Sequence, residues 1–466
     1  MPDPLPPVVP LLRQRNFAAL WWGQLISILG ERLTYLALDG LLAKHTTYFR
    51  DPRVSSLLLT VLFLVTLAPV LLFAPFTGAW VDRWNLKRVM VGSDLLRSGL
   101  VVLIPVAYLA TAHTLPVFVL VFALFTCNVF FLPAKSALTP ELVPPEQLLP
   151  ANALLSGAGI VATAAGMLGG GWIIDHWGWS RALYLNGATY LVSVIALLII
   201  RYRPAPHLHR AADPTVRSYL AEVAEGWSIV RRNPAVGLAL TAMAAVWVGG
   251  GLLHVAGNQH VQRAAGIPGM LRVGVLVSTL GFGSALTTWW LNKGGRRVPR
   301  PLLFGGGLLI AAAGILAFAV STRFAIFTVA AFLIGIGAAP AFMLPDTLIQ
   351  ESTEMRQRGR VFSARDFLMR LVALVGAGAA WWATRALGIV SALLLCAGAV
   401  ACAGLLSLAW GRRVPKLMRT GGPDREHRQP VTRPGRGKPA VPRGCRGAAA
   451  HRSPDVAVLR DVRRTG

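Results

Sequence analysis

The sequence GAWVDRWNLKR, Gly78–Arg88, is a short charged stretch in an otherwise apolar chain. One acid and three bases stand between Asp82 and Arg88, and apolar runs of membrane-spanning length flank the stretch at 54–81 and 89–111. Charges and unpaired backbone groups need water or protein partners, so a turn this short between two spans must lie at one face of a membrane. The stretch therefore predicts an integral membrane protein.

The composition supports the same class. Hydrophobic residues make up 54% of the 466 residues, charged residues only 14%, and the mean hydropathy is +0.56. A soluble domain carries about 25% charged residues. The net charge of +26 is carried largely by loops and the tail, so we expect a lipid bilayer around the protein and no nucleic-acid partner. The four cysteines are too scattered for a disulfide framework or a metal site, and we expect neither a metal nor another cofactor.

Runs of about 20 apolar residues predict membrane-spanning helices. Twelve such runs occur, near 17–43, 54–81, 89–111, 115–133, 151–174, 182–200, 235–257, 271–291, 302–320, 325–345, 362–384 and 388–410. The sequence also indicates a duplication, because Asn292–Arg297 repeats the charged turn at the corresponding place of the second half. We therefore predict an all-α membrane protein in which twelve helices form two pseudo-symmetric six-helix bundles.

The expected domains follow from these runs. They are a cytoplasmic segment (1–16), a first bundle (17–200), a central linker with an amphipathic stretch (201–233), a second bundle (234–410) and a tail (411–466). The tail holds 15 basic and 4 acidic residues with many prolines and glycines, and is expected to be mostly disordered. With the N-terminus inside, the leader and inner loops hold 19 lysines and arginines and the outer loops 7, so both termini are expected in the cytoplasm.

The spacing of Gly78, Asp82, Arg83, Lys87 and Arg88 resembles the signature between the second and third spans of the major facilitator superfamily of transporters. Asn85 stands where the family often has glycine, and asparagine tolerates a left-handed turn. The resemblance covers about residues 11–410. It implies that Asp82 meets the N-terminus of the eleventh span, near Val361, and that the three bases hold acids or lipid headgroups in one state of a gate.

Further stretches are similar to the branch of the superfamily that exports enterobactin and macrolides. They are Arg15–Phe17, Gly23–Ser27, Gly30–Leu33, Pro133–Leu138, Glu141–Pro144, Ala151–Leu154 and Arg358–Ser363. One departure concerns the fifth span. Drug antiporters of the family carry Gly-Pro-x-x-Gly-Gly there, whereas this chain has Gly166–Gly171 without the proline.

Charges near the signature are expected to belong to the same gate. Asp94 and Arg97 lie three residues apart and can pair on one helical face. Arg365 and Asp366 occupy the corresponding part of the eleventh span. The alternative is that these groups form a static clasp that serves topology alone.

The first span carries a polar stripe that is expected to line a cavity. Its members recur at helical spacing: Gln24, Ser27, Glu31, Thr34, Tyr35 and Asp39. Glu31 lies ~21 Å along the helix from Phe17, near the middle of the bilayer. It is a candidate for contact with a proton or substrate, and Arg32 beside it is a further candidate. The alternative role for Glu31 is a fixed salt bridge that only holds helices together, with Arg32 as the expected partner.

Three other polar residues of the spans are candidates for the cavity. Trp247 and His254 recur at helical spacing in the seventh span, where a packing role is favoured for the histidine. Asn128 in the fourth span either contacts substrate or joins two helices. Motifs of hydrolases or ATP-driven pumps do not occur, so we expect no enzyme.

These features predict a monomeric transporter in the cytoplasmic membrane of a bacterium. The favoured function is proton-coupled export of a small amphiphilic molecule, such as a drug, siderophore or natural product. The first alternative is an uptake symporter on the same fold, which the missing proline keeps open. The second is a membrane scaffold or sensor that does not transport, for which the basic tail is the hint.

Overall fold

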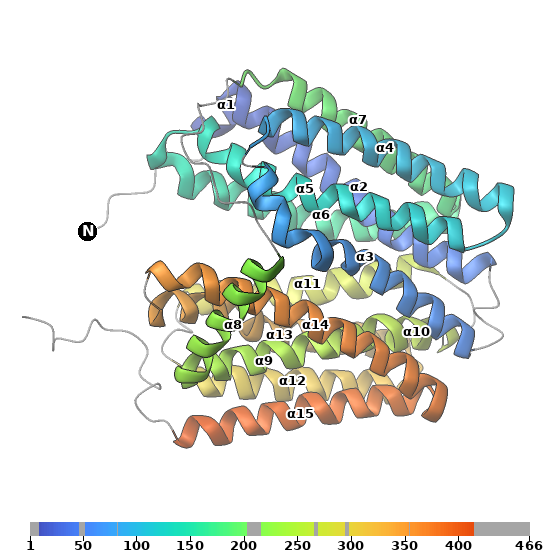
Figure 1. Ribbon diagram of the computed structural model, residues 1–466. Coiled ribbons are helices and arrows are strands. Elements are labelled where there is room, and N and C mark those ends of the chain that lie inside the picture. Colours follow the sequence, from blue (N-terminus) through green and yellow to red (C-terminus); the bar gives the residue numbers. More distant parts are fainter. Residues whose placement is uncertain are drawn as a thin grey trace, which may run out of the picture. The chain divides into compact units, whose positions relative to one another are not determined.

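The computed structural model describes residues 9–45, 52–81, 83–202, 216–264, 269–293, 298–353 and 355–413, and these are helical apart from short turns (Figure 1). The helices of the first half are α1 (Val9–Arg13), α2 (Arg15–His45), α3 (Pro52–Val81), α4 (Leu86–Thr111), α5 (Leu115–Leu142), η2 (Pro145–Gln147), α6 (Leu148–Trp177) and α7 (Trp179–Ile199). After the linker helix α8 (Val216–Arg232), the second half contains α9 (Pro234–Leu252), η3 (Leu253–Gly257), α10 (Asn258–Ala264), α11 (Met270–Lys293), α12 (Arg300–Val320), α13 (Phe324–Ser352), α14 (Met355–Leu387) and α15 (Ile389–Arg413).

The helices have the lengths and surfaces of membrane spans. Among the described residues, eleven segments are long and apolar enough to cross a membrane, and they correspond to α3–α7 and α9–α15, with α9, η3 and α10 forming one span. Side chains such as Leu115, Phe282 and Val320 are 65% or more exposed, which suits contact with lipid. The remaining long helix, α2, has 31 residues and owes its lower apolarity to the charges in its middle. The predicted all-helical fold with twelve spans is confirmed by these helices.

The helices group by contact into two sets. In the first half α2 packs on α6 and α7, α4 packs on α5 and α7, and α3 packs on α5. In the second half α12 packs on α13 and α15, α11 packs on α13, and α9 packs on α13, α14 and α15. The two sets meet chiefly where α6 packs on α11 and α3 packs on α14. These two helix pairs therefore position any site that lies between the halves.

Glycines allow α6 and α11 to approach closely. A Cβ atom on Gly171 would lie 2.5 Å from Leu271 Cα, and one on Gly274 would lie 2.2 Å from the Met167 carbonyl oxygen. Real side chains do not reach such distances without moving the backbone. The small residues of Gly166–Gly171 thus serve helix packing, as is usual in membrane interiors.

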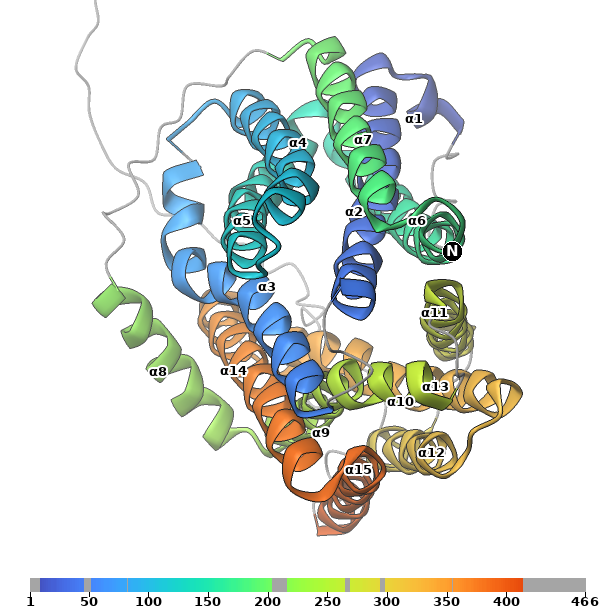
Figure 2. The ribbon, with the colours of Figure 1, turned by 90° about the vertical axis from the view of Figure 1, so that its right-hand side faces the viewer.

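The linker between the halves contains one amphipathic helix, as its sequence predicts. Helix α8 packs on α14, and Figure 2 shows the two side by side. Gly226 faces the Arg360 carbonyl so closely that a Cβ atom would clash with it, and Glu225 forms an ion pair with Arg360. Both charged side chains are about half exposed. Helix α8 is therefore attached mainly by close backbone packing against α14.

Two ends of the bundle can be told apart by the helices that mark them (Figure 1). We call the end near α8 the α8 end and the opposite end, near α10, the α10 end. Helices α3 and α5 finish at the α8 end, whereas α2 and α6 finish at the α10 end. The predicted domain limits stay predictions, and the predicted disordered tail lies outside the described residues from position 414 onward.

Candidate functional site

A cluster of charged and aromatic side chains joins α2, α4 and α7 inside the first half. The Arg97 guanidinium donates to the Asp94 carboxylate at 3.0 Å, to the Glu31 carboxylate at 3.0 Å and to the Tyr190 hydroxyl at 2.9 Å. It also lies over the Tyr190 ring, 4.2 Å from its centroid. The side chains of Asp94 and Arg97 are almost wholly buried. Removal of the Arg97 cation would leave the Asp94 and Glu31 carboxyl groups inside the bundle without this partner, which lowers the stability of the protein.

The partner of Glu31 is thus Arg97 and not its neighbour Arg32. Adjacent residues of a helix point about 100° apart, so Glu31 and Arg32 do not face each other. Arg32 instead lies over the Tyr35 ring at 5.4 Å, and its buried Nε atom has no hydrogen-bond partner. The salt bridge considered from the sequence between Glu31 and Arg32 does not form. The expected pairing of Asp94 with Arg97 does form, but as part of a larger group.

The polar residues of α2 point in different directions. Thr34 accepts a hydrogen bond from the Asn186 amide of α7 at 2.5 Å, inside the first half. Gln24 and Ser27 are buried as well. Tyr35 and Asp39 face the second half and line a cavity there, and Arg32 lines it too. The predicted single polar face is therefore divided between the interior of one bundle and the interface of two.

The cavity lies between the two halves and has a volume of about 300 Å³. Arg32, Tyr35 and Asp39 line it from α2, while His254 and Asn258 line it from the second half. The remaining lining is mostly aliphatic and comes from α2, α6, η3, α10, α11, α12 and α13. A mainly apolar pocket with a few convergent polar groups is the usual form of a small-molecule site.

A π-helical turn, η3, brings polar groups of the seventh span to this cavity. Such turns insert one residue into a helix and occur often at functional sites. His254 lies within η3 and packs on the Phe63 ring of α3 at 5.0 Å. Asn258 follows η3 and donates to the Asp39 carboxylate at 3.0 Å, whereas the other Asp39 oxygen is buried without a partner. The histidine therefore packs on an aromatic ring and also lines the cavity, and its contact with substrate stays a prediction.

Two other candidates lie away from these contacts. Trp247, on α9, packs edge to face on Phe342 at 5.9 Å, and its buried Nε1 atom has no hydrogen-bond partner. Asn128 is half-buried on α5. Neither residue is among those that line the cavity described above.

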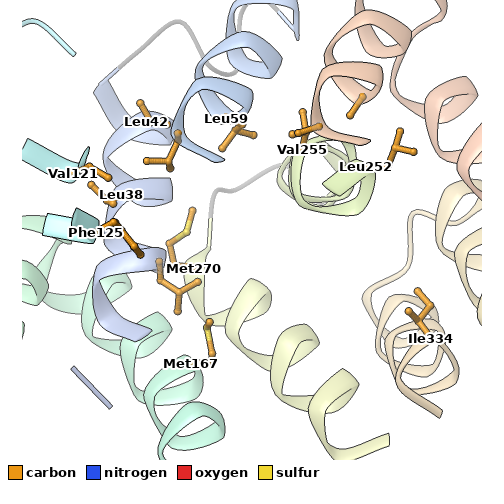
Figure 3. Close-up of a cluster of buried hydrophobic side chains, with 14 of the residues drawn as sticks. Leu38, Leu42, Leu59, Val121, Phe125, Met167, Leu252, Val255, Met270 and Ile334 are labelled. Atoms are coloured by element: carbon orange, nitrogen blue, oxygen red, sulfur yellow. The ribbon is translucent and has the colours of Figure 1, made fainter. Parts of the chain in front are cut away.

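The two halves are joined at the α10 end. In addition to the Asp39–Asn258 bond, the Thr60 hydroxyl donates to the Ala377 carbonyl at 3.4 Å. Figure 3 shows Leu42 and Leu59 of the first half beside Val255 of the second, within one buried cluster. The cavity is thus covered by packed side chains on its α10 side.

An acid of α6 strengthens this closure. The Asp175 carboxylate accepts the backbone N–H of Met270 at 2.8 Å and that of Leu271 at 2.9 Å, the first two residues of α11. A helix N-terminus leaves such N–H groups without partners in its own turn. Sequence reasoning overlooked Asp175, although its surroundings repeat the spacing around Asp82, as described below.

At the α8 end, the signature stretch lies between α3 and α4. Asp82 is outside the described residues, Gly78 belongs to the last turn of α3, and Arg83 and Arg88 are exposed. The Lys87 ammonium donates to the last carbonyls of α7, those of Leu198 and Ile200, at 3.0 and 2.6 Å. Lys87 therefore stabilises the C-terminal end of a helix within its own half.

Asn85 has a role other than the expected left-handed turn. Its φ is −69° and its ψ is 109°, and its side chain accepts the backbone N–H of Arg88 at 3.0 Å. It is therefore the N-cap residue of α4.

Arg365 and Asp366 lie near the α8 end of α14. The Arg365 guanidinium donates to Asp366 at 2.6 and 2.9 Å and forms an ion pair with Asp346 of α13. These carboxylates are nearly half exposed. The expected pair is thus present, and it includes an acid of the tenth span that the sequence analysis overlooked because no helical spacing links Asp346 to Arg365.

Comparison with known proteins agrees with this architecture. The sequence matches the family model of the Major Facilitator Superfamily over residues 20–377 and 271–459. It is 25% identical over 382 residues to Macrolide efflux protein A of Streptococcus pyogenes, which covers 78% of this chain and 87% of the relative. It is also 26% identical over 362 residues to a Bacillus subtilis protein that carries the provisional name bacilysin exporter BacE, again covering 78% of this chain and 87% of the relative.

Solved structures share the fold. A bacterial homologue of the human lysosomal transporter Spinster, in an inward-facing and occupied conformation, superposes with a TM-score of 0.67 at 14% identity and covers 88% of this chain and 99% of that one. The family match extends over most of the chain and agrees with the helices, the cavity and the resemblance at Gly78–Arg88. The chain is a multi-pass membrane protein that belongs to the major facilitator superfamily of transporters.

Proposed function

We propose that this protein is a secondary active exporter of small amphiphilic molecules, driven by a proton gradient and working by alternating access. The observation that carries the proposal is the cavity between the halves, which residues of both halves line. In transporters built from repeats, such a midplane cavity holds the substrate while the halves rock around it. The relatives named for macrolide efflux and bacilysin export support the outward direction.

The lining suggests what kind of substrate fits. Arg32 and Asp39 are seven residues apart on α2 and therefore ~10 Å apart along its axis. Between and opposite them the lining is mainly apolar, with side chains such as Met167 and Phe318. An amphiphilic molecule with an apolar body and a polar or charged group near either end would match this distribution.

Asp39 is better placed than Glu31 to couple a proton to the substrate. One Asp39 carboxylate oxygen has no hydrogen-bond partner, and the residue lines the cavity. Glu31 accepts from Arg97, a cation that also holds Asp94. We therefore propose Asp39 as the coupling acid and Glu31 as part of the charged group within the first half.

The expected energy source, location and assembly belong to the same proposal. The proton gradient would act across the cytoplasmic membrane of a bacterium, with the α8 end and both termini in the cytoplasm. The charge distribution in the loops supports this orientation. A monomer suffices, because residues of one chain line the cavity from both halves.

Replacing Asp39 by asparagine tests the coupling. Asparagine can still interact with Asn258, but it cannot carry a proton. We expect Asp39→Asn to fold, to lose uptake driven by an imposed pH gradient in inside-out vesicles, and to retain downhill exchange of a preloaded compound. The compound is first selected by a resistance screen in a strain that lacks its own exporters.

Glu31→Gln is the comparison that separates the two acids. Loss of gradient-driven uptake in Glu31→Gln alone, with Asp39→Asn unchanged, would transfer the coupling role to Glu31. Uptake in right-side-out vesicles instead of inside-out ones would identify an uptake symporter. Such a symporter stays open, since Gly166–Gly171 of α6 lacks the proline that drug antiporters carry at this place. Deletion of residues 415–466 without loss of transport would count against the scaffold alternative.

A further inference from the structure

The contact between Asp175 and α11 ties one half of the molecule to the other. Asp175 stands in the last turn of α6, and both of its carboxylate oxygens accept backbone N–H groups of the first turn of α11. Hydrogen bonds from neutral donors to a carboxylate are stronger than those between neutral groups. The negative charge also lies at the positive end of the α11 dipole. The contact therefore favours the arrangement in which the ends of α6 and α11 touch.

Helices α6 and α11 pack so closely beside this contact that they cannot approach any further. Gly171, one turn before Asp175, faces the backbone of Met270 and Leu271 with no space for a Cβ atom. Met270 itself is 3% exposed and belongs to the same buried cluster as Leu42 and Leu59. Separation of α6 from α11 at this end would break the two hydrogen bonds and expose that cluster.

The sequence around Asp175 repeats the signature stretch. In both copies glycine precedes the acid by four positions, a basic residue and a tryptophan follow it, and asparagine or glycine comes next. The first copy is Gly78, Asp82, Arg83, Trp84 and Asn85, and the second is Gly171, Asp175, His176, Trp177 and Gly178. Gly178 has a φ of +91° and ends α6, which makes it a turn residue in fact.

The two copies occupy equivalent helices at opposite ends of the molecule. Helix α3 is the second of the first three long helices, and α6 is the second of the next three. Inverted repeats of three helices relate such positions by a two-fold axis in the membrane plane. The helices that α3 and α6 contact across the interface, α14 and α11, are related in the same way. The end of α6, where Asp175 lies, thus corresponds in the repeat to the end of α3, which Asp82 follows in the sequence.

We propose that Asp175 is a positioning residue of the transport cycle that holds the α10 end closed by capping α11. The inference uses the alternating access of the proposed function but does not depend on any substrate. A variant that loses the Asp175 charge should shift the molecule toward states open at the α10 end.

The test measures how easily a buried position at that end reacts with a thiol reagent. Leu59 of α3 is fully buried in the cluster that covers the cavity. In a background whose four cysteines are replaced by alanine, Leu59→Cys is introduced and the protein is placed in nanodiscs. The rate of labelling by a membrane-impermeant maleimide then reports opening of the α10 end.

Asp175→Asn should raise this rate by roughly two- to fivefold, as expected for loss of a charge at an exposed helix N-terminus. Asp175→Glu keeps the charge and should resemble the parent. His176→Asn is the matched control, because the ring of His176 contacts Trp172 of its own helix.

Unchanged or slower labelling in folded Asp175→Asn would overturn the proposal. Equal increases in Asp175→Asn and His176→Asn would also overturn it, since they would indicate a general loosening of the turn. If Asp175→Asn unfolds during purification, Asp175→Gln takes its place. Faster labelling in Asp175→Gln together with the parent labelling rate in Asp175→Glu supports the proposal, and the parent rate in both variants overturns it. Because labelling needs no substrate, failure of the exporter assignment would leave this result unaffected.

Discussion

Arg97 connects three helices through one side chain, and its environment determines what its removal would do. The guanidinium meets acids from α2 and α4 and the aromatic ring and hydroxyl of Tyr190 from α7. Loss of the Arg97 cation leaves buried acids without a partner and costs several kcal/mol, whereas replacement of Glu31 by a neutral amide leaves Arg97 paired with Asp94. The two kinds of change in this group should therefore have unequal effects.

We expect Arg97→Met to lower stability by about 3–5 kcal/mol and Glu31→Gln to lower it much less. Thermal unfolding of the purified proteins in detergent checks the order. Arg181→Met is the control, since this arginine is exposed on α7 and surface changes stay within about 0.5 kcal/mol. Similar melting temperatures for Arg97→Met and Arg181→Met would show that the buried group contributes little to stability.

At the scale of elements, the contact of α6 with α11 depends on which glycines face it. Gly171 meets the α11 backbone, whereas a Cβ atom on Gly169 would have nothing within 4 Å. The two residues belong to the same helix and differ only in the direction in which they point.

We expect Gly171→Ala to destabilise the protein by roughly 1–3 kcal/mol, as overpacking does, and to increase labelling at Leu59→Cys. Gly169→Ala should be neutral or slightly stabilising, because alanine is the better helix former. Melting temperatures of the two variants in the same detergent provide the measurement. Equal losses in both would mean that a property of the whole helix, such as its flexibility, matters more than the contact.

At the scale of the whole molecule, the distribution of lysines and arginines predicts which end faces the cytoplasm. The bases of the leader and inner loops outnumber those of the outer loops by 19 to 7. This count predicts that the α8 end, together with both termini, lies inside the cell.

A reporter fused after Pro415 should therefore be active only in the cytoplasm. Fusions of an alkaline phosphatase and of a fluorescent protein at this position give opposite signals on the two sides. As a control, a phosphatase fused at His113, in the loop after α4, should be active, because this loop is expected outside the cell. Phosphatase activity at Pro415 would indicate inverted insertion or an odd number of spans.

The sequence by itself determined the class of the protein and nearly all of its helices. Apolar runs long enough to cross a bilayer must be helical, because lipid offers no partner to backbone groups, so spans such as 54–81 and 302–320 match α3 and α12 closely. The signature at Gly78–Arg88 identified the family through local spacing alone. The amphipathic linker helix was also readable, since its pattern depends only on near neighbours.

Only the tertiary structure decided which partners the polar residues have. Periodicity places Glu31, Thr34 and Asp39 on one side of α2. It does not predict that their partners are Arg97, Asn186 and Asn258, which lie on three other helices. Such contacts join residues 66 to 219 positions apart, and no local propensity encodes them. The capping of α11 by Asp175 has the same origin, because it exists only when α6 and α11 pack together. Helix formation is a local property of the chain, whereas a site between helices depends on how whole helices pack.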